Sequence, residues 1–449
     1  MKRFFSLLLL LCLLLNLSAA AADATPLPDA QKVVLTHTDT KNENKSVVRL
    51  YQVKTAQTAV DEEINGLAKA YADELGANLP KARNQGDQNS RLDVDIRYSR
   101  TGLSWLSFVV QARTSFHRDL TAQSFTTRSY DMATGERLTL KDIFPEESEA
   151  WALLADAVKA SINAYYPKEE ADAAAVEAAC TREALAGADF ALHGMSLELL
   201  HPAQTFYPKH FTLIRTTLFY PDIRPMMTGA AQEATDNQRY YKMIALTFDD
   251  GPVRTNSSKV LNSLMEEGAV GTFFVIGNRV SKMEDIVQRE HDEGHSIGMH
   301  NWHHGNVNKS KPGALRAMVG KCNKVMLHAI GMTAKYDRVP YGLYPKMIKS
   351  KVGWPYIQWS IDTYDWRGRS TRQVTATVKA QLHDGAIVLM HDIKDHTPDS
   401  VKKIVQMLNE QGYMTLTIDE LFAKDGVTLQ RDEVYFRCED GDTTIKKRR

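Results

Sequence analysis

Cysteine is scarce in this chain of 449 residues, which has four, and none of them has the spacing of a metal site. Lysine and arginine together number 55, as do aspartate and glutamate, so the totals lack the basic excess that nucleic acid or an anionic membrane would call for. No glycine-rich loop with the spacing of a nucleotide-binding fingerprint is present. These absences argue against a nucleic-acid partner and against a nucleotide-binding fold.

Long apolar runs are also rare, and the one candidate lies at the N-terminus. It covers residues 4–17, follows Lys2 and Arg3, and is followed by small residues at 18–22. A membrane span needs about 20 apolar residues, so this pattern predicts a signal peptide over residues 1–22, with an uncleaved anchor as the alternative. We therefore expect a secreted, extracytoplasmic protein of the cell envelope with no stable membrane span after cleavage.

Export would leave three cysteines, Cys180, Cys322 and Cys438. Because three is an odd number, at least one thiol stays free or pairs between chains. A bond between Cys322 and Cys438 would pin the C-terminal tail, but three separate buried thiols is the preferred interpretation.

The first half of the chain shows no regular alternation of strands and helices. Strands are expected at 46–53, 91–98, 105–112, 124–132, 196–200 and 211–219, and helices at 59–77, 147–165 and 172–185. This pattern predicts a smaller α+β domain over residues 27–228, followed by a polar linker at 228–238.

From residue 240 to 425 strands and helices alternate, which predicts an α/β domain with a parallel sheet. Strands are expected at 243–248, 271–275, 296–299, 335–339, 356–361, 386–390 and 413–417, with helices between them. Seven such units with polar motifs at the strand ends favour a barrel with its site on that face, and an open doubly wound sheet is the alternative. Residues 426–449 form a tail.

Five short motifs follow the ends of these strands in order. They are Thr247–Pro252 (TFDDGP), His300–His304 (HNWHH), Arg338–Gly342 (RVPYG), Asp362–Trp366 (DTYDW) and Leu389–His391 (LMH). Each string alone is a weak signal, and each residue type in them also has ordinary turn, capping or core roles. Five such motifs in order, each at the end of a predicted strand, predict one shared site.

The motifs contain a candidate metal site. His300 and His304 are four residues apart and can face one point if a helical turn begins after His300; His303, at a spacing of three, competes with His304. Asp250 with the two imidazoles would leave one position open, which is typical of a catalytic metal. Zinc suits these ligands best, with cobalt or manganese as alternatives.

The remaining motif residues supply acid–base groups. Asp249 is the candidate base toward a water that the metal activates, with Arg338 holding it ionised, and the backbone N–H of Tyr341 would stabilise the oxyanion. His391 is the candidate acid.

Three further residues support this arrangement. Asp365 could pair with His391 and keep it protonated. Trp366 and Leu389 either line a small methyl pocket or are ordinary core residues.

The five motifs resemble those of the polysaccharide deacetylase family, the carbohydrate esterases (family 4) with a NodB-homology domain. The resemblance covers residues 241–422 and implies a distorted (β/α)7 barrel that removes acetyl groups from polysaccharides with a divalent metal. It implies the same roles for the residues named above. Asn301 departs from the family pattern, which has Ser or Thr there.

A fainter likeness concerns residues 130–144, which resemble a signature of the extracytoplasmic domain of lysozyme-sensing anti-sigma factors. The resemblance implies a cell-wall setting and possible binding of lysozyme or wall by the N-terminal domain. We therefore expect a metal-dependent N-deacetylase of peptidoglycan. The alternatives are a deacetylase of chitin-like, poly-N-acetylglucosamine or acetylated xylan chains, or an inactive glycan-binding module.

Overall fold

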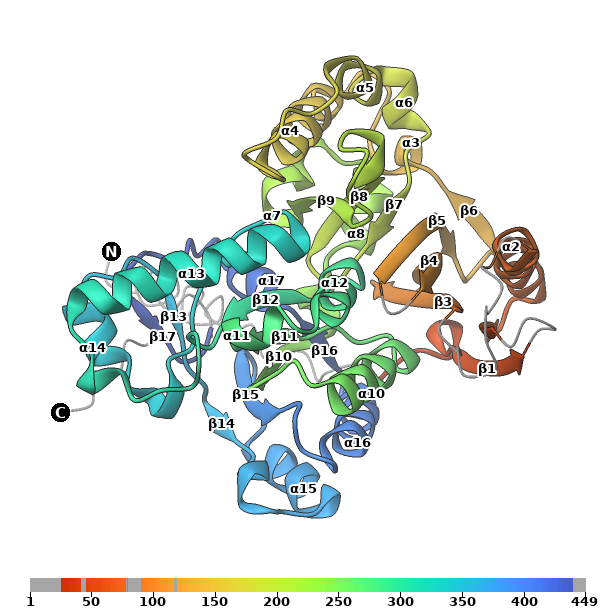
Figure 1. The fold of residues 1–449 in the computed structure, drawn as a ribbon. Coiled ribbons are helices and arrows are strands. Elements are labelled where there is room, and N and C mark those ends of the chain that lie inside the picture. Colours follow the sequence, from red (N-terminus) through yellow and green to blue (C-terminus); the bar gives the residue numbers. More distant parts are fainter. Residues whose placement is uncertain (1–25, 42–45, 78, 80–89, 117–118, 439–449) are drawn as a thin grey trace, which may run out of the picture.

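The computed structural model describes residues 26–41, 46–77, 79, 90–116 and 119–438 (Figure 1). The predicted signal peptide at residues 1–22 and the end of the predicted tail, 439–449, lie outside the described residues. None of the helices in the described part of the chain has the length and hydropathy of a membrane span. The strands described here form four sheets.

The N-terminal sheet has six strands in sequence order. They are β1 (Val34–Lys41), β2 (Val47–Lys54), β3 (Ser90–Thr101), β4 (Trp105–Phe116), β5 (Asp119–Asp131) and β6 (Glu136–Leu138). β2 and β3 are parallel, and the crossover between them contains helix α2 (Thr58–Ala77). Val60, Ile64 and Ala68 of α2 are buried in the cluster that also holds the sheet's apolar side chains, as their helical spacing predicts.

A second part of the N-terminal half has a small antiparallel sheet of three strands, β7 (Phe190–Leu192), β8 (Ser196–Pro202) and β9 (Leu213–Phe219). Its helices are α3 (Leu140–Ile143), α4 (Ala150–Ala164), α5 (Ala173–Ala179), α6 (Arg182–Ala186), α7 (Tyr220–Ile223), α8 (Gly229–Ala234) and α9 (Asn237–Tyr240). The predicted linker is thus helical. Asn237 within it is buried, accepts a hydrogen bond from the Gly102 N–H and donates one to the Gly194 carbonyl.

The C-terminal sheet is parallel, in the order β12-β11-β10-β15-β14, with β16 paired to β10. Its strands are β10 (Lys242–Asp249), β11 (Thr272–Val275), β12 (Ser296–Met299), β14 (Ile361–Asp362), β15 (Ala386–His391) and β16 (Tyr413–Leu416). The helices are α10 (Arg254–Glu266), α11 (Gly277–Val280), α12 (Glu284–Asp292), α13 (Pro312–Ile330), α14 (Tyr344–Lys349), α15 (Thr371–Gln381), α16 (Thr397–Glu410) and α17 (Ile418–Ala423). Short 3-10 turns occur at Asp29–Gln31, Ala203–Thr205, Arg224–Met226, Val307–Lys309, Pro340–Gly342 and Asp365–Arg367. The α/β class is confirmed.

Two predicted strands take another form. Residues 335–339 contribute only single bridges from Asp337 to Met299 and to Tyr356, because Pro340 has no N–H and Tyr341 has a left-handed φ of 61°. The strand predicted at 356–361 splits into β13 (Tyr356–Ile357) and β14, whose partners differ. The described strands form an open path, and a closed seven-stranded barrel stays a prediction.

The predicted tail is partly folded. β17 (Val434–Tyr435) pairs with β13, and the buried thiol of Cys438 donates to Asp425. Cys180, Cys322 and Cys438 are all free thiols, so no bond joins Cys322 to the tail.

Candidate metal centre and active site

The five motifs meet at one edge of the C-terminal sheet, where parallel strands bring their carboxyl ends together. Asp249 at the end of β10 lies opposite His391 at the end of β15 and opposite Phe274 of β11. His300 follows β12 directly, and its backbone N–H donates to the Val275 carbonyl of β11. Register alone therefore places the candidate base and acid on neighbouring strands, and the first imidazole two strands from the base at the same edge of the sheet.

The three predicted metal ligands converge. One ligand atom each from Asp250, His300 and His304 can be chosen so that all lie within 4.8 Å of one another. Asp250 Oδ1 is 3.2 Å from His304 Nε2 and 3.6 Å from His300 Nε2. His303 is exposed and belongs to no such group among the described residues, so of the two histidines only His304 converges with Asp250 and His300.

The imidazole of His300 is held in the form that ligates a metal. Its Nδ1 bonds the Arg338 carbonyl, which fixes the ring and leaves Nε2 toward Asp250. Burial lowers the pKa of His300 to about 3, so the ring is neutral at physiological pH. Asp250 Oδ1 is buried and has no hydrogen-bond partner in the described structure, so this oxygen is available to a cation.

Left-handed backbone conformations recur in the loops that carry the motifs. Asp250 (φ 77°), Asn301 (φ 60°), His304 (φ 51°), Tyr341 (φ 61°) and Tyr364 (φ 55°) all have positive φ. Such residues cost energy and persist where their surroundings hold them in place, often at functional sites. Asn is among the residues that adopt this conformation most readily, which gives a physical reason for Asn301.

Asp249 is paired with a fully buried arginine. Arg338 Nη1 donates to Asp249 Oδ1 at 2.9 Å, and its other donors reach the carbonyls of Ile357 and Gln358. Burial raises the pKa of Asp249, while the charge of Arg338 acts in the opposite direction. The carboxyl is thus oriented and has a proton affinity above that of an ordinary aspartate, as a general base needs.

His391 is paired with Asp365 as predicted. Asp365 Oδ1 lies 2.7 Å from His391 Nδ1, and Asp365 Oδ2 accepts from the His391 backbone N–H, also at 2.7 Å. Burial alone would lower the pKa of His391, but the hydrogen bond and charge of Asp365 outweigh it and the pKa is raised. This favours the protonated imidazole, the form that a general acid requires.

Of the three further predicted residues, two are exposed and one is buried. The Tyr341 side chain is 66% exposed, with its ring centroid 4.7 Å from that of His304. Trp366 is 46% exposed, whereas Leu389 is buried in β15. A shared methyl pocket for Trp366 and Leu389 stays a prediction.

Sequence reasoning missed the segment that joins the two ligand loops. Arg279 Nη1 donates to the Asp250 carbonyl at 2.7 Å, and the Ile276 N–H donates to the Gly251 carbonyl. The next two backbone N–H groups, at 277 and 278, donate to the carbonyls of residues 301 and 302. The only sequence signal was position, because this segment follows the predicted strand 271–275.

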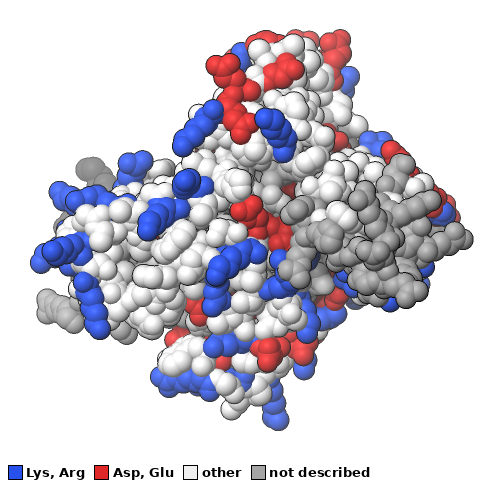
Figure 2. All heavy atoms as spheres, viewed as in Figure 1, with Lys and Arg blue, Asp and Glu red and all other residues white. Residues whose placement is uncertain are grey.

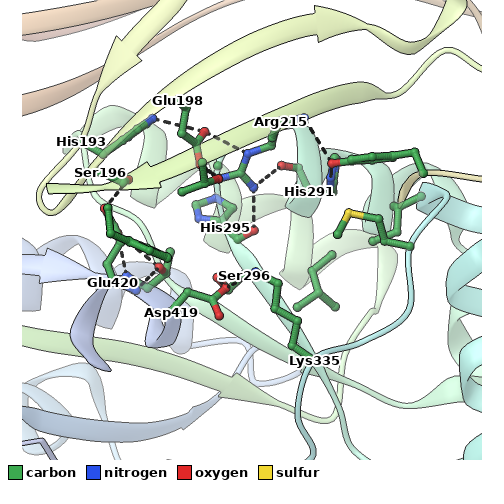
Figure 3. A pocket seen from close by; sticks show the side chains of 18 of the residues that line it. His193, Ser196, Glu198, Arg215, His291, His295, Ser296, Lys335, Asp419 and Glu420 are labelled. Atoms are coloured by element: carbon green, nitrogen blue, oxygen red, sulfur yellow. Dashed lines mark hydrogen bonds and ion pairs between the residues drawn. The ribbon is translucent and has the colours of Figure 1, made fainter. Parts of the chain in front are cut away.

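A separate cavity of about 90 Å³ lies between the three-stranded sheet and the start of β12 (Figure 3). Arg215 of β9 lines this cavity, pairs with Glu198 and donates to the carbonyls of His291 and His295. None of the predicted site residues lines this cavity. The cavity lies where the three-stranded sheet meets the start of β12, whereas His300 follows the other end of that strand.

Comparison with known proteins finds similarity in the C-terminal part of the chain, which contains the candidate site. The sequence pattern of the family described as polysaccharide deacetylase matches residues 236–353. A peptidoglycan-N-acetylglucosamine deacetylase of Bacillus cereus is 31% identical over 189 residues, which cover 40% of this chain and 68% of that protein. The chain belongs to the polysaccharide deacetylase family.

Other relatives are longer. The peptidoglycan-N-acetylglucosamine deacetylase PgdA of Listeria monocytogenes is 40% identical over 195 residues, which span 43% of this chain and only 41% of that protein. Among solved structures, the peptidoglycan deacetylase PdaC of Bacillus subtilis is 30% identical and covers 41% of this chain and 91% of the solved chain, with a TM-score of 0.40.

Proposed function

We propose that this protein is a metal-dependent N-deacetylase acting on the acetylated sugars of peptidoglycan. The observation that carries the proposal is the convergence of Asp250, His300 and His304 beside two acid–base pairs, Asp249–Arg338 and His391–Asp365. The sequence similarity of this chain to peptidoglycan deacetylases of Bacillus and Listeria supports peptidoglycan as the proposed substrate.

The residues fit a divalent ion, with zinc the best match to two imidazoles and one carboxylate. The unpartnered oxygen of Asp250 and the neutral ring of His300 are the features that make the fit. When bound there, such an ion would polarise the acetyl carbonyl and lower the pKa of water.

The chain's own groups account for the proton movements of amide hydrolysis. As water adds to the acetyl carbon, Asp249 accepts its proton, and Arg338 keeps that carboxyl oriented toward the site. The Tyr341 N–H donates to the oxyanion. His391 then gives a proton to the sugar nitrogen as the C–N bond breaks, which yields acetate and a free amine, while Asp365 holds the imidazole in place.

Acetate release from purified peptidoglycan, with and without a chelator, tests this function. We expect release that stops with the chelator and returns with zinc, cobalt or manganese. Release from chitin-like polymers, poly-N-acetylglucosamine or acetylated xylan alone would favour the alternative substrates. Release from none of these polymers with metal present would favour an inactive glycan-binding module.

Export and wall binding are further parts of the proposal. The apolar run at residues 4–17 supports secretion to the cell envelope, which N-terminal sequencing of the extracellular protein would test. The segment resembling anti-sigma factors spans the end of β5, β6 and α3, and supports binding of lysozyme or wall. Failure of the full chain to retain lysozyme in a pull-down would contradict lysozyme binding.

A further inference from the structure

Charge is distributed unevenly although the chain as a whole is neutral. Between residues 296 and 361 the sequence has ten lysines and arginines but a single acid, Asp337. Asp337 is fully buried, so it neutralises nothing at the surface of this segment. The segment includes α13 and α14, the helices at the left of Figure 1.

Two of the ten cations have partners. Arg338 is buried against Asp249, and Lys335 pairs with Asp419. The other eight make no ion pair among the described residues, and we call them the basic face: Lys309, Lys311, Arg316, Lys321, Lys324, Lys346, Lys349 and Lys351. Seven of these are exposed and Lys346 is partly so. In Figure 2 the left part of the molecule accordingly shows blue side chains without red ones.

The basic face is continuous in sequence with the site. Lys309 comes five residues after His304, and α14 begins three residues after Tyr341. α13 has 19 residues, so it extends the face over about 28 Å. Lys321 of α13 also lies near the ligand loop in space, with its Nζ 5.9 Å from the ring centroid of Trp302, so a polymer lying across the metal cluster can continue over α13.

We propose that the basic face holds the anionic stem-peptide carboxylates of the peptidoglycan strand whose sugar occupies the site; this rests on the proposed function. Seven of the eight cations are lysines, which act as point charges rather than as bidentate forks. The face therefore suits repeated, flexibly placed carboxylates, with an attraction that salt screens.

A membrane surface fits the basic face less well. The large exposed hydrophobic residues in the described structure are Val34, Leu103, Tyr341 and Trp366, and none of them lies on α13 or α14. A membrane-seated face normally inserts apolar side chains between its cations.

The test is a variant of the full chain in which four lysines of the basic face are replaced by uncharged glutamine, Lys321→Gln/Lys324→Gln/Lys346→Gln/Lys349→Gln. Its matched control changes four exposed lysines elsewhere: Lys168→Gln/Lys209→Gln/Lys379→Gln/Lys403→Gln. Acetate release is measured on peptidoglycan and on the neutral trimer of N-acetylglucosamine, at low salt and in about 0.5 M NaCl. We expect kcat/KM on peptidoglycan to fall roughly tenfold at low salt in the first variant only, as for four exposed charge pairs. The difference should vanish at high salt.

On the neutral trimer both variants should match the parent within about twofold. Equal loss on both substrates, no loss on either, or a loss that salt does not remove would overturn the inference. So would variant-sensitive binding to phosphatidylglycerol vesicles with peptidoglycan activity unchanged, which would assign the face to a membrane. If the parent released no acetate, the proposed function would fail. Binding of the stem peptides by the basic face would still be supported if the protein sedimented with peptidoglycan in a salt-sensitive way and only the first variant sedimented less.

Discussion

β12 joins two pairs of histidines with the same spacing and opposite environments. Before the strand, His291 Nε2 bonds the Tyr165 hydroxyl at 2.8 Å and His295 Nδ1 accepts from the Gly271 N–H at 3.2 Å. After the strand, Nε2 of His300 and Nε2 of His304 both face Asp250 Oδ1. A spacing of four residues therefore does not by itself indicate a metal site.

The backbone explains the difference. His291 lies in the last turn of α12, and ring nitrogens of His291 and His295 are already bonded to the Tyr165 hydroxyl and the Gly271 N–H, so both rings serve packing and hydrogen bonding. The second pair lies in a loop whose left-handed residues, Asn301 and His304, turn the rings toward a carboxylate that lacks other partners. Convergence on an unpartnered oxygen distinguishes the candidate ligand pair from the structural pair.

The largest effect should come from removing a ligand. His304→Ala leaves Asp250 and His300 alone, and we expect metal content near zero and turnover lower by on the order of 10⁴-fold or more. Metal content by atomic spectroscopy and acetate release measure both. His303→Ala, a neighbouring exposed histidine, is the control and should match the parent. Full metal content in His304→Ala would contradict the assignment.

Asp249→Asn should separate catalysis from metal binding. The amide cannot accept the proton, so we expect kcat to fall roughly 10²- to 10⁴-fold. Metal content should remain because Asp249 is not among the three converging ligands. Undiminished turnover would show that another group is the base.

A smaller effect concerns pH. The raised pKa of His391 means that turnover should decline only as pH rises above the ordinary value of 6.5 and through the raised value. By linkage, the stability that this group contributes is fully present below pH 6.5 and is lost as pH rises through the folded-state pKa. Asp365→Asn should move the alkaline limb of the kcat profile to lower pH and lower turnover about tenfold.

The control for this pH prediction is Asp395→Asn, an exposed acid in the loop after His391 that accepts a hydrogen bond from Asn256. Its profile should overlay that of the parent. An unmoved alkaline limb in Asp365→Asn would assign that limb to a different group.

Much of the site was predictable because parallel strands carry their C-terminal residues to one edge, so Asp249, His300 and His391 could be placed from strand positions alone. The choice of His304 over His303 was not, because it depends on loop backbone angles. Arg279 lies 29 residues from the carbonyl that it binds, and no local pattern connects the two. The basic face was not predicted from composition, because acidic residues in other segments balance its charge in the net charge of the whole chain.

The smallest effect on activity should come from the structural pair. Tyr165→Phe removes a buried hydroxyl that bonds His291 and accepts from the Arg215 N–H, which should cost about 1–2 kcal/mol in the free energy of unfolding. Urea unfolding measures that loss, with Tyr240→Phe as a control for the same atom removed from a partly exposed ring. Metal content and kcat should stay within about twofold of the parent, because β12 separates this contact from the ligand loop. A loss of metal content of more than about twofold in Tyr165→Phe would mean that the contacts of His291 before β12 help to position His300 after it. The two histidine pairs would then be coupled.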